Sequence, residues 1–202
     1  MKDYLEEILG EYQCGFRPQR TTTDQIFVGR QILEKFYAHD INHHLLFIDF
    51  KKAFDSINQK KLLESLASFG VSKKIERLVK MTLEAAQGKV IVDGKISNPF
   101  VTGRGVRQVD GLSATLFNLV LHRALKNLVQ SNMILNRLTQ ICGYANDILV
   151  IARSLTAFEA MFAEISREEG RVGLVVNPDK TKYIRSSASP SQRSVKWATI
   201  KV

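Results

Sequence analysis

The stretch Ile141–Val150, ICGYANDILV, decides how the rest of this chain can be arranged. Two short apolar runs flank the polar pair Asn146 and Asp147, and a tight turn between the runs would place this pair at the tip of a β-hairpin. A hairpin tip is a natural place to present two carboxylates for metal chemistry. Only Asp147 is a carboxylate here, so the stretch leaves three alternatives: a working site, a spoiled site or an ordinary turn.

A second carboxylate ends another apolar run. The residues His44–Phe50, HLLFIDF, are typical of a buried strand, and Asp49 lies near its end. Taken alone, Asp49 is better explained as the N-cap of a following helix. If both runs are central strands of one sheet, Asp49 and Asp147 meet at one point. Two carboxylates at such a point can hold the Mg²⁺ pair, roughly 4 Å apart, that catalyses phosphoryl transfer.

The remaining apolar spacing predicts alternating helices and hairpins. Helices are expected at about 22–37, 59–69, 72–87, 113–130 and 156–169, and short strands at 89–92, 173–176 and 182–184. The first helix should carry Ile26, Leu33, Phe36 and Tyr37 on one face. Asp93-Gly94 is a strong hairpin turn signal. Hairpins favour a mostly antiparallel sheet with helices packed on one face, which is an α+β fold class.

Composition allows one compact domain with a sizeable core in 202 residues. There is no run of roughly 18 apolar residues, so no membrane span is expected. The acidic, amphipathic N-terminus differs from a signal peptide, and the two cysteines occur in unrelated contexts. These features predict an intracellular protein, nuclear or cytoplasmic. The net charge of +9 suits a polyanionic partner, although a solvated basic tail explains part of it equally well.

Five segments, in this order along the chain, resemble motifs of reverse transcriptases of the non-LTR retrotransposon type. YQCGFRPQRTTTDQI (12–26) is similar to the region between fingers and palm, and FIDFKKAFDSI (47–57) to the first catalytic motif. GRGVRQVDGLSATLFNLVL (103–121) resembles the Gln-Gly-Asp motif, and GYANDILVIA (143–152) the Tyr-Ala-Asp-Asp box. GLVVNPDKTKYI (173–184) is similar to the motif that follows the catalytic hairpin. The resemblance covers about residues 4–185.

This resemblance implies a fold, an activity and partners. The fold would be a polymerase palm with part of the fingers over residues 1–185, followed by a basic flexible tail at 186–202 that leads toward a missing thumb. The activity would be that of an RNA-directed DNA polymerase, a nucleotidyltransferase with Mg²⁺, or Mn²⁺, as cofactor. The partners would be an RNA template, a DNA primer and deoxynucleoside triphosphates.

The resemblance also assigns catalytic and metal-binding residues. Asp49, Asn146 and Asp147 occupy the catalytic positions. The metal ligands would be Asp49, Asp147 and the backbone carbonyl of Phe50. The carboxylates are hard oxygen ligands of the kind that Mg²⁺ prefers.

Further residues are assigned to substrates in the same way, each beside a plainer alternative. Phe54 would act as a gate against the ribose 2′-OH, or would pack in the core. Gln108 would line the nucleotide and template pocket, or would cap the next helix. Lys180 would lie near the leaving pyrophosphate, or would be another solvated lysine. Arg17 and Arg20 would contact template phosphate in a salt-dependent manner.

Two residues depart from the family pattern. Asn146 stands where the family has a second aspartate, and Val109 stands where it has glycine. The first change removes a negative charge from the metal site, and the second crowds the nucleotide pocket. An impaired reverse transcriptase is therefore expected. The alternative is a non-catalytic nucleic-acid-binding palm; an unrelated two-carboxylate nuclease or nucleotide cyclase is disfavoured because it has no place for five ordered motifs.

Overall fold

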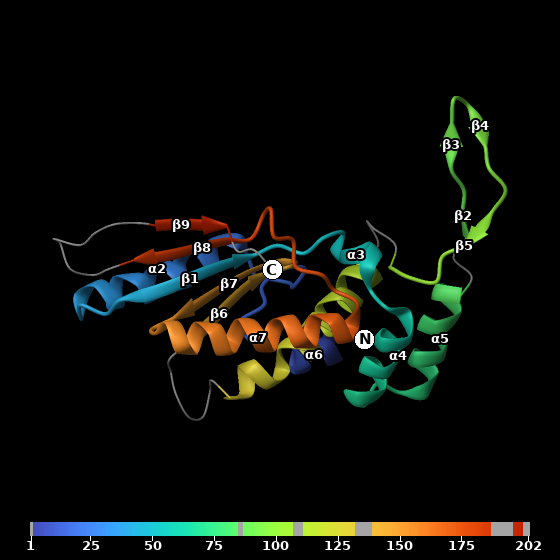
Figure 1. Cartoon of the computed structure of the whole chain (residues 1–202). Helices are drawn as coiled ribbons and strands as arrows, with labels where there is room; N and C mark the ends of the chain where they lie inside the picture. The colour runs from blue at the N-terminus through green and yellow to red at the C-terminus, as the bar shows by residue number, and fades with distance from the viewer. Residues whose placement is uncertain (1, 85–86, 107–110, 132–138, 187–195, 200–202) are drawn as a thin grey trace.

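A five-stranded antiparallel sheet forms the centre of the molecule (Figure 1). The computed structural model describes residues 2–84, 87–106, 111–131, 139–186 and 196–199. The strand order is β6-β7-β1-β8-β9, so β1 is the central strand although it is the first strand along the chain. The strands are β1 (His43–Ile48), β6 (Thr139–Tyr144), β7 (Asp147–Ala152), β8 (Lys182–Ser186) and β9 (Lys196–Thr199). The predicted α+β fold with an antiparallel sheet is confirmed.

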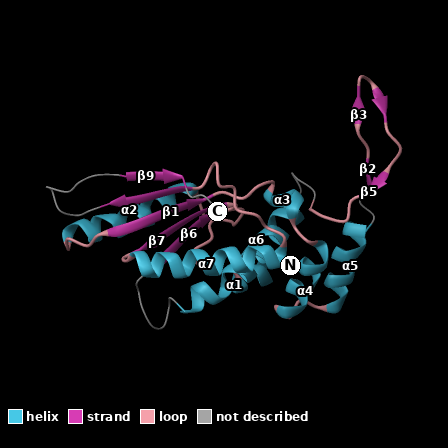
Figure 2. Cartoon of the chain, in the orientation of Figure 1, coloured by secondary structure: helices cyan, strands magenta, loops and turns pink. Residues whose placement is uncertain are grey.

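Helices surround this sheet, and the larger of two hydrophobic cores lies between several of them and one face of the sheet (Figure 2). They are α1 (Lys2–Ile8), α2 (Thr22–Ala38), α3 (Ala53–Ser56), α4 (Gln59–Ser68), α5 (Lys73–Glu84), α6 (Gly111–Ser131) and α7 (Leu155–Val172). Side chains alternate between the faces of a strand, and the even-numbered residues of β1 and β7 face α6 and α7. Leu46 and Val150 accordingly share one core cluster with Phe117 of α6 and Ile165 of α7.

The opposite face of the sheet is covered in part by α2, which corrects the expectation that helices pack on one face. Phe36 of α2 forms a second core cluster with Leu45 and Ile151, which belong to the odd-numbered set of strand residues. Only the second half of α2 makes this contact. Ile26, expected to share the face of Phe36, is therefore 70% exposed at the other end of the helix.

An arm made of two short two-stranded sheets projects from the body beside α5 (Figure 1). Its strands are β2 (Gln87–Gly88), β3 (Ile91–Val92), β4 (Lys95–Ile96) and β5 (Phe100–Val101), and they pair as β2-β5 and β3-β4. Asp93 and Gly94 both have positive φ, 48° and 74°, as a type I′ hairpin turn requires. The hairpin predicted from Asp93-Gly94 is thereby confirmed.

Two segments near the end of the chain differ from the sequence prediction. The strand expected at 173–176 is reduced to a single antiparallel bridge between Val176 and Phe50. The chain turns sharply just before it, because Gly173 has φ +87° and packs against the backbone of Ser56. Residues Lys196–Thr199, within the expected flexible tail, form β9 on the edge of the sheet. The domain division at residue 185 stays a prediction.

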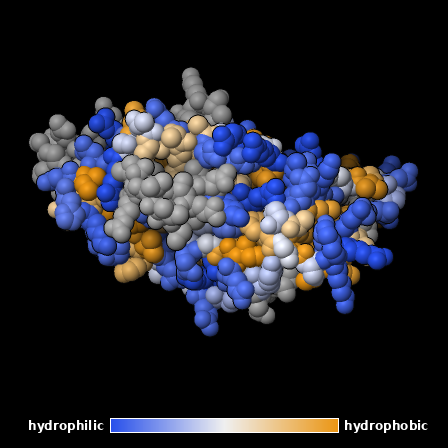
Figure 3. Space-filling model, turned by 90° about the horizontal axis from the view of Figure 1, so that it is seen from below, coloured by the Kyte–Doolittle hydropathy of each residue, from blue (hydrophilic) through white to orange (hydrophobic). Residues whose placement is uncertain are grey.

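The outer surface is mixed in polarity. On the face drawn in Figure 3, hydrophilic side chains separate several apolar patches. Among the described residues, no helix combines the length and the hydrophobicity needed to cross a membrane.

Candidate active site

The strand register brings two carboxylates together. Strands β1 and β7 are antiparallel, with Ile48 opposite Ile148. The next pair in this register is Asp49 opposite Asp147, the first residue of β7. Directly opposed residues of an antiparallel pair lie on the same face of a sheet. The two carboxylates therefore lie side by side at one end of the central strands.

These carboxylates line a pocket of about 370 Å³ between the sheet and the start of α2. Lys180 contributes a positive charge to its wall, and most of the remaining wall is apolar. The lining residues are Thr22, Gln25, Ile26, Phe47, Ile48, Asp49, Cys142, Gly143, Tyr144, Asp147, Ile148, Leu149 and Lys180. The charged groups thus gather at one end of a largely apolar pocket.

The electrostatics of the pair are those of crowded negative charge. Burial raises the pKa of Asp147 above its ordinary value, and the negative charge of Asp49 raises it further. The ammonium group of Lys180 acts in the opposite sense but does not reverse the shift. Since a cation between the two carboxylates would relieve this repulsion, the site favours a bound positive charge.

A turn in the segment after α7 holds Asp49 in place. Asn177 donates from Nδ2 to Oδ2 of Asp49 at 3.1 Å, and its backbone N–H donates to the carbonyl of Asp49 at 2.8 Å. The backbone N–H of Asp49 donates to Oγ1 of Thr181 at 3.4 Å. The turn closes through hydrogen bonds from the backbone N–H groups of Lys180 and Thr181 to the carbonyl of Asn177. It sets Nζ of Lys180 at 3.9 Å from Oδ2 of Asp49.

The donor set around the pair fits a magnesium ion. Both contacts of the Asp49 carboxylate with Asn177 and Lys180 involve Oδ2, so among the described contacts Oδ1 faces no donor. The carbonyl of Asp49 accepts a hydrogen bond from Asn177, and the carbonyl of Phe50 as a third ligand stays a prediction. Two carboxylates and a carbonyl are oxygen ligands suited to Mg²⁺. Among the described residues, no group of three or more acidic, histidine or cysteine side chains is placed so that it could hold a metal ion.

The hairpin tip carrying Asn146 is held by residues that sequence analysis missed. The turn between β6 and β7 consists of Ala145 and Asn146, and Asn146 is half-buried. The side chain of Gln13 bonds to both the N–H and the carbonyl of Ala145. Gly15 packs so closely on Ala145 that a Cβ at residue 15 would lie 2.0 Å from the Ala145 nitrogen. The glycine in the motif around Gly15 was the one signal that could have pointed to this close approach.

Phe54 lies in an aromatic cluster outside the pocket lining. Its ring stacks on Phe117 with centroids 4.7 Å apart and meets the edge of Phe16 at 6.1 Å. It is partly buried against the main core. This geometry supports the core-packing alternative, and a role for Phe54 as a gate stays a prediction.

Arg17 is an internal anchor in this structure, and its predicted contact with template phosphate stays a prediction. Its side chain is only 3% exposed and pairs with Glu6 at 2.8 Å. It also donates to the carbonyls of Gly10 at 3.0 Å and Gln13 at 2.9 Å. A guanidinium that satisfies internal acceptors in this way is withdrawn from solvent, and it cannot reach a phosphate without breaking these bonds.

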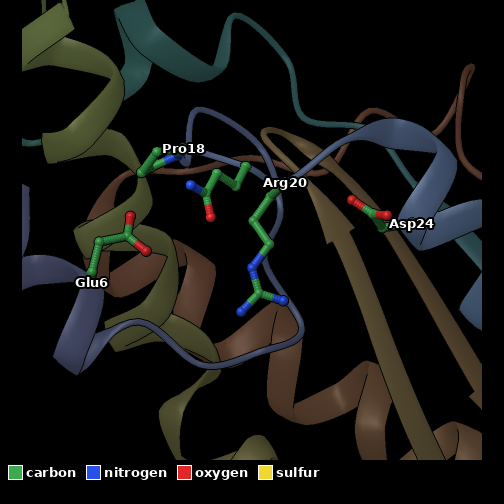
Figure 4. Close-up of a pocket in the computed structure, with 5 residues that line it drawn as sticks. Glu6, Pro18, Arg20 and Asp24 are labelled. Carbon is green, nitrogen blue, oxygen red and sulfur yellow. The ribbon is translucent and has the colours of Figure 1, made fainter.

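Arg20, by contrast, is partly exposed. It borders a second pocket of about 580 Å³ together with Glu6, Pro18, Gln19 and Asp24 (Figure 4). The guanidinium of Arg20 donates a hydrogen bond to the carboxylate of Glu11 at 2.6 Å, and this bond, with the negative charge of that carboxylate, raises the pKa of Arg20. The predicted phosphate contact of Arg20 stays a prediction, since a phosphate would have to compete with Glu11. Gln108 and Val109 lie outside the described residues.

Comparisons with known proteins agree with this geometry. The family model described as "Reverse transcriptase (RNA-dependent DNA polymerase)" matches residues 1–202. The Pol polyprotein of the type-2 retrotransposable element R2DM of Drosophila melanogaster is 28% identical over 183 residues, which is 90% of this chain and 17% of that protein. The transposon TX1 149 kDa protein of Xenopus laevis is 26% identical over 166 residues, 79% of this chain and 12% of that protein. The chain thus spans less than a fifth of either relative.

Solved structures share the fold at low identity. Telomerase from Candida tropicalis, in complex with a fragment of telomeric RNA, superposes with a TM-score of 0.73 at 16% identity, over 94% of this chain and 33% of that chain. Telomerase from Candida albicans superposes with a TM-score of 0.72 at 12% identity, over 100% of this chain and 37% of that chain. These likenesses support the fold alone. With the family match over its whole length, this chain belongs to the reverse transcriptase family and is related to the proteins of non-LTR retrotransposons.

Proposed function

We propose that residues 1–185 form a polymerase palm with part of the fingers, and that Asp49 and Asp147 are its metal-binding carboxylates. The observation that carries this proposal is the register of β1 and β7, which sets the two carboxylates opposite each other beside Lys180. The reaction would be RNA-templated DNA synthesis by nucleotidyl transfer. The reverse transcriptase family typically uses Mg²⁺.

Each residue would have a distinct role at the site. Asp49 and Asp147, with the carbonyl of Phe50, would hold the divalent cations, which when bound supply charge stabilisation at the attacking and leaving oxygens. Asn177 orients Asp49 through its hydrogen bond at 3.1 Å. Lys180, whose ammonium lies 3.9 Å from Asp49, would offer positive charge to the departing pyrophosphate.

We propose that Asn146 impairs this chemistry. An amide can donate one neutral oxygen to a cation but brings no negative charge, so the site holds two carboxylates where its family pattern has three. Weaker support of the attacking and leaving oxygens can raise the barrier by several kcal/mol, and each ~1.4 kcal/mol is a factor of ten in rate. Val109 would add a second defect in the nucleotide pocket.

Template, primer and nucleotides would be the partners of the site. The net charge of +9 suits a phosphate backbone, and Arg20 is a candidate contact on the surface. Such binding releases counterions, so the affinity for a single strand or a hybrid duplex should fall steeply between low and moderate salt. Affinity that does not change with salt would contradict this assignment of partners.

The test combines metal binding with catalysis. The chain should bind Mn²⁺, followed by electron paramagnetic resonance of the free ion, and Asp49→Asn or Asp147→Asn should remove this binding. Asp93→Asn, in the exposed turn of the arm, is the matched control and should leave it unchanged. Mn²⁺ binding that survives Asp147→Asn would refute the site.

Primer extension on an RNA template with Mg²⁺ then separates the catalytic and non-catalytic proposals. We expect little or no extension by the unaltered chain. Robust extension would refute the impairment, because it would show that Asn146 is tolerated. Salt-dependent binding of nucleic acid without any Mn²⁺ site would instead support the non-catalytic palm.

A further inference from the structure

The turn of the β6–β7 hairpin contains a residue in a disfavoured conformation. Ala145 has φ +56°, in the left-handed region. That region costs an alanine about 1–2 kcal/mol, and hairpin turns with positive φ at the first central position prefer glycine there. Strained residues of this kind persist only where the surrounding structure holds them. Something must therefore hold Ala145, directly beside Asn146 and Asp147.

The side chain of Gln13 provides this restraint. It is fully buried, and its Oε1 accepts hydrogen bonds from the backbone N–H groups of Ala145 and Gly15, both at 2.8 Å. Its Nε2 donates to the carbonyl of Ala145 at 3.0 Å. One amide group thus bonds to both backbone polar groups of Ala145. If the oxygen and nitrogen of this amide were exchanged, its NH₂ group would face the N–H donors of Ala145 and Gly15. Only one orientation of the amide therefore satisfies these hydrogen bonds.

The backbone around Gln13 is joined to the hairpin as well. Gln13 forms a parallel bridge with Gly143 of β6. The N–H of Cys14 donates to the carbonyl of Gly143 at 2.9 Å, and the N–H of Gly143 donates to the carbonyl of Tyr12 at 2.6 Å. Since a Cβ at Gly15 would overlap the nitrogen of Ala145, no space remains between this segment and the tip.

The segment is braced from the other side by α6 and by Arg17. Asn118 of α6 donates from Nδ2 to the carbonyl of Gly15 at 2.7 Å. Arg17 donates to the carbonyl of Gln13 at 2.9 Å. Tyr12 shares a hydrogen bond with His122 of α6 at 3.2 Å. The segment that contains Gln13 is therefore held by α6 and by Arg17. Through its bonds to Ala145, Gln13 in turn holds the hairpin tip in a fixed position relative to α6.

We infer that Gln13 is a positioning residue for the metal site. By holding Ala145 in its left-handed conformation, Gln13 sets where Asn146 and Asp147 stand relative to Asp49. This inference rests on the proposed function, because Gln13 acts through Asp147 and touches no reacting group. Without the amide of Gln13, the turn relaxes toward a conformation that suits alanine, and Asp147 shifts from its place opposite Asp49.

The first experiment measures hydrogen exchange at single amides of the unaltered chain. The N–H groups of Ala145 and Gly15 should be protected to the level of the core strands, although turn amides ordinarily exchange quickly. Fast exchange at Ala145 would overturn the inference directly. This readout needs no metal and no variant, so it tests the restraint on Ala145 separately from the proposed function.

The second experiment replaces the amide by an apolar group of similar size. Gln13→Met should weaken Mn²⁺ affinity roughly 10- to 100-fold, the range found when partners of metal ligands are removed, and should free the amide of Ala145. Gln59→Met is the control for loss of a glutamine amide, because Nε2 of Gln59 also donates to backbone carbonyls, those of Thr102 and Gly105, away from the hairpin. Unchanged Mn²⁺ affinity in folded Gln13→Met would refute the positioning role.

A rescue variant separates positioning from general stability. Glycine adopts positive φ without strain, so Ala145→Gly should restore most of the Mn²⁺ affinity lost in Gln13→Met. Alone, Ala145→Gly should change that affinity little. A general loss of folding would not respond to this substitution, so failure of the rescue would show that Gln13 supports the fold and does not position the turn.

Discussion

Asn177 and Asp49 are joined by two hydrogen bonds, one between side chains at 3.1 Å and one from the Asn177 backbone N–H to the Asp49 carbonyl at 2.8 Å. The pair therefore fixes both the strand end and the carboxylate that the strand presents. Asn177 begins the turn that also carries Lys180. Any change at Asn177 should consequently affect stability and site geometry together.

Asn177→Ala should lower the free energy of unfolding by about 1–2 kcal/mol, because a hydrogen bond to a partly buried carboxylate is lost. Urea denaturation measures this difference. Asn98→Ala, at an exposed position of the arm, should change the same free energy by less than about 0.5 kcal/mol. Equal effects at the two positions would show that the Asn177 side chain contributes nothing.

Asp147→Asn should stabilise the metal-free protein at neutral pH. The pKa of Asp147 is raised in the folded state by burial and by Asp49, so its ionised form is disfavoured there. A raised carboxyl pKa gives stability at low pH that is lost as pH rises through the folded value. The melting temperature of Asp147→Asn should therefore exceed that of the unaltered chain at pH 7, and the difference should vanish in acid. If Asp147→Asn melted at a lower temperature than the unaltered chain at pH 7, the proposed repulsion between Asp147 and Asp49 would be contradicted.

His122 should make the fold sensitive to acid. Burial, with the positive charges of Lys126 and Arg17, lowers the pKa of His122 to about 4. A histidine whose pKa is depressed in the folded state contributes stability above its unfolded value, near 6.5, and that stability is lost as pH falls toward 4. The loss should be on the order of 3 kcal/mol, from 1.36 kcal/mol for each pKa unit.

Urea denaturation at pH 7 and pH 4.5 measures this effect. His122→Gln should flatten the change in unfolding free energy between these two values, although His43 and His44, whose pKa values burial also lowers, keep part of it. His39→Gln, at the exposed end of α2, is the control and should leave the change intact. An unaltered slope in His122→Gln would exclude His122 as its source.

Arg17→Met should lower the free energy of unfolding by about 2–4 kcal/mol, because it leaves a carboxylate and two carbonyls without their shared donor. Arg20→Met removes a partly exposed ion pair and should change the free energy of unfolding much less. Denaturation of the two variants in parallel checks the contrast. Comparable losses would mean that burial of Arg17 has no energetic consequence.

Reversion of the two departures from the family pattern should restore activity only in combination. Asn146→Asp should strengthen Mn²⁺ binding but should not bring primer extension to normal rates, since the defects affect separate requirements. The double variant with Val109→Gly, grafted into a chain that supplies complete fingers and thumb, should extend far better. Primer extension on RNA compares the unaltered chain, the single variants Asn146→Asp and Val109→Gly, and the grafted double variant. Full activity from the single reversion would assign the whole defect to Asn146.

The central part of the fold could be predicted because local patterns are strong there. Alternation and apolar runs marked β1, β6 and β7, and Asp93-Gly94 marked the turn of the arm. Once β1 and β7 pair in one sheet, their register places Asp49 opposite Asp147. The place of α2 could not be predicted, since its apolar residues, Ile26 and Phe36 among them, do not reveal which of them the sheet will cover.

The supports of the site were also beyond prediction. Gln13 is a single polar residue in an irregular segment, and its partner Ala145 lies 132 residues away. The family resemblance assigns Arg17 to template phosphate, whereas its burial against Glu6 and two backbone carbonyls arises only from tertiary contacts. Such residues have no periodicity, and they acquire their roles from segments that meet only in the folded chain.

The central place of β1 has a consequence for folding during synthesis. Asp49 leaves the ribosome long before its neighbour Asn177, which follows 128 residues later. At the usual ~5–20 residues per second, β1 waits roughly 6 to 26 s for its second edge to be covered. Throughout that interval the unpaired N–H and C=O groups and the apolar side chains of β1 are open to unwanted strand pairing, so production of this domain should benefit from chaperones that bind extended segments, or from slower initiation at low temperature.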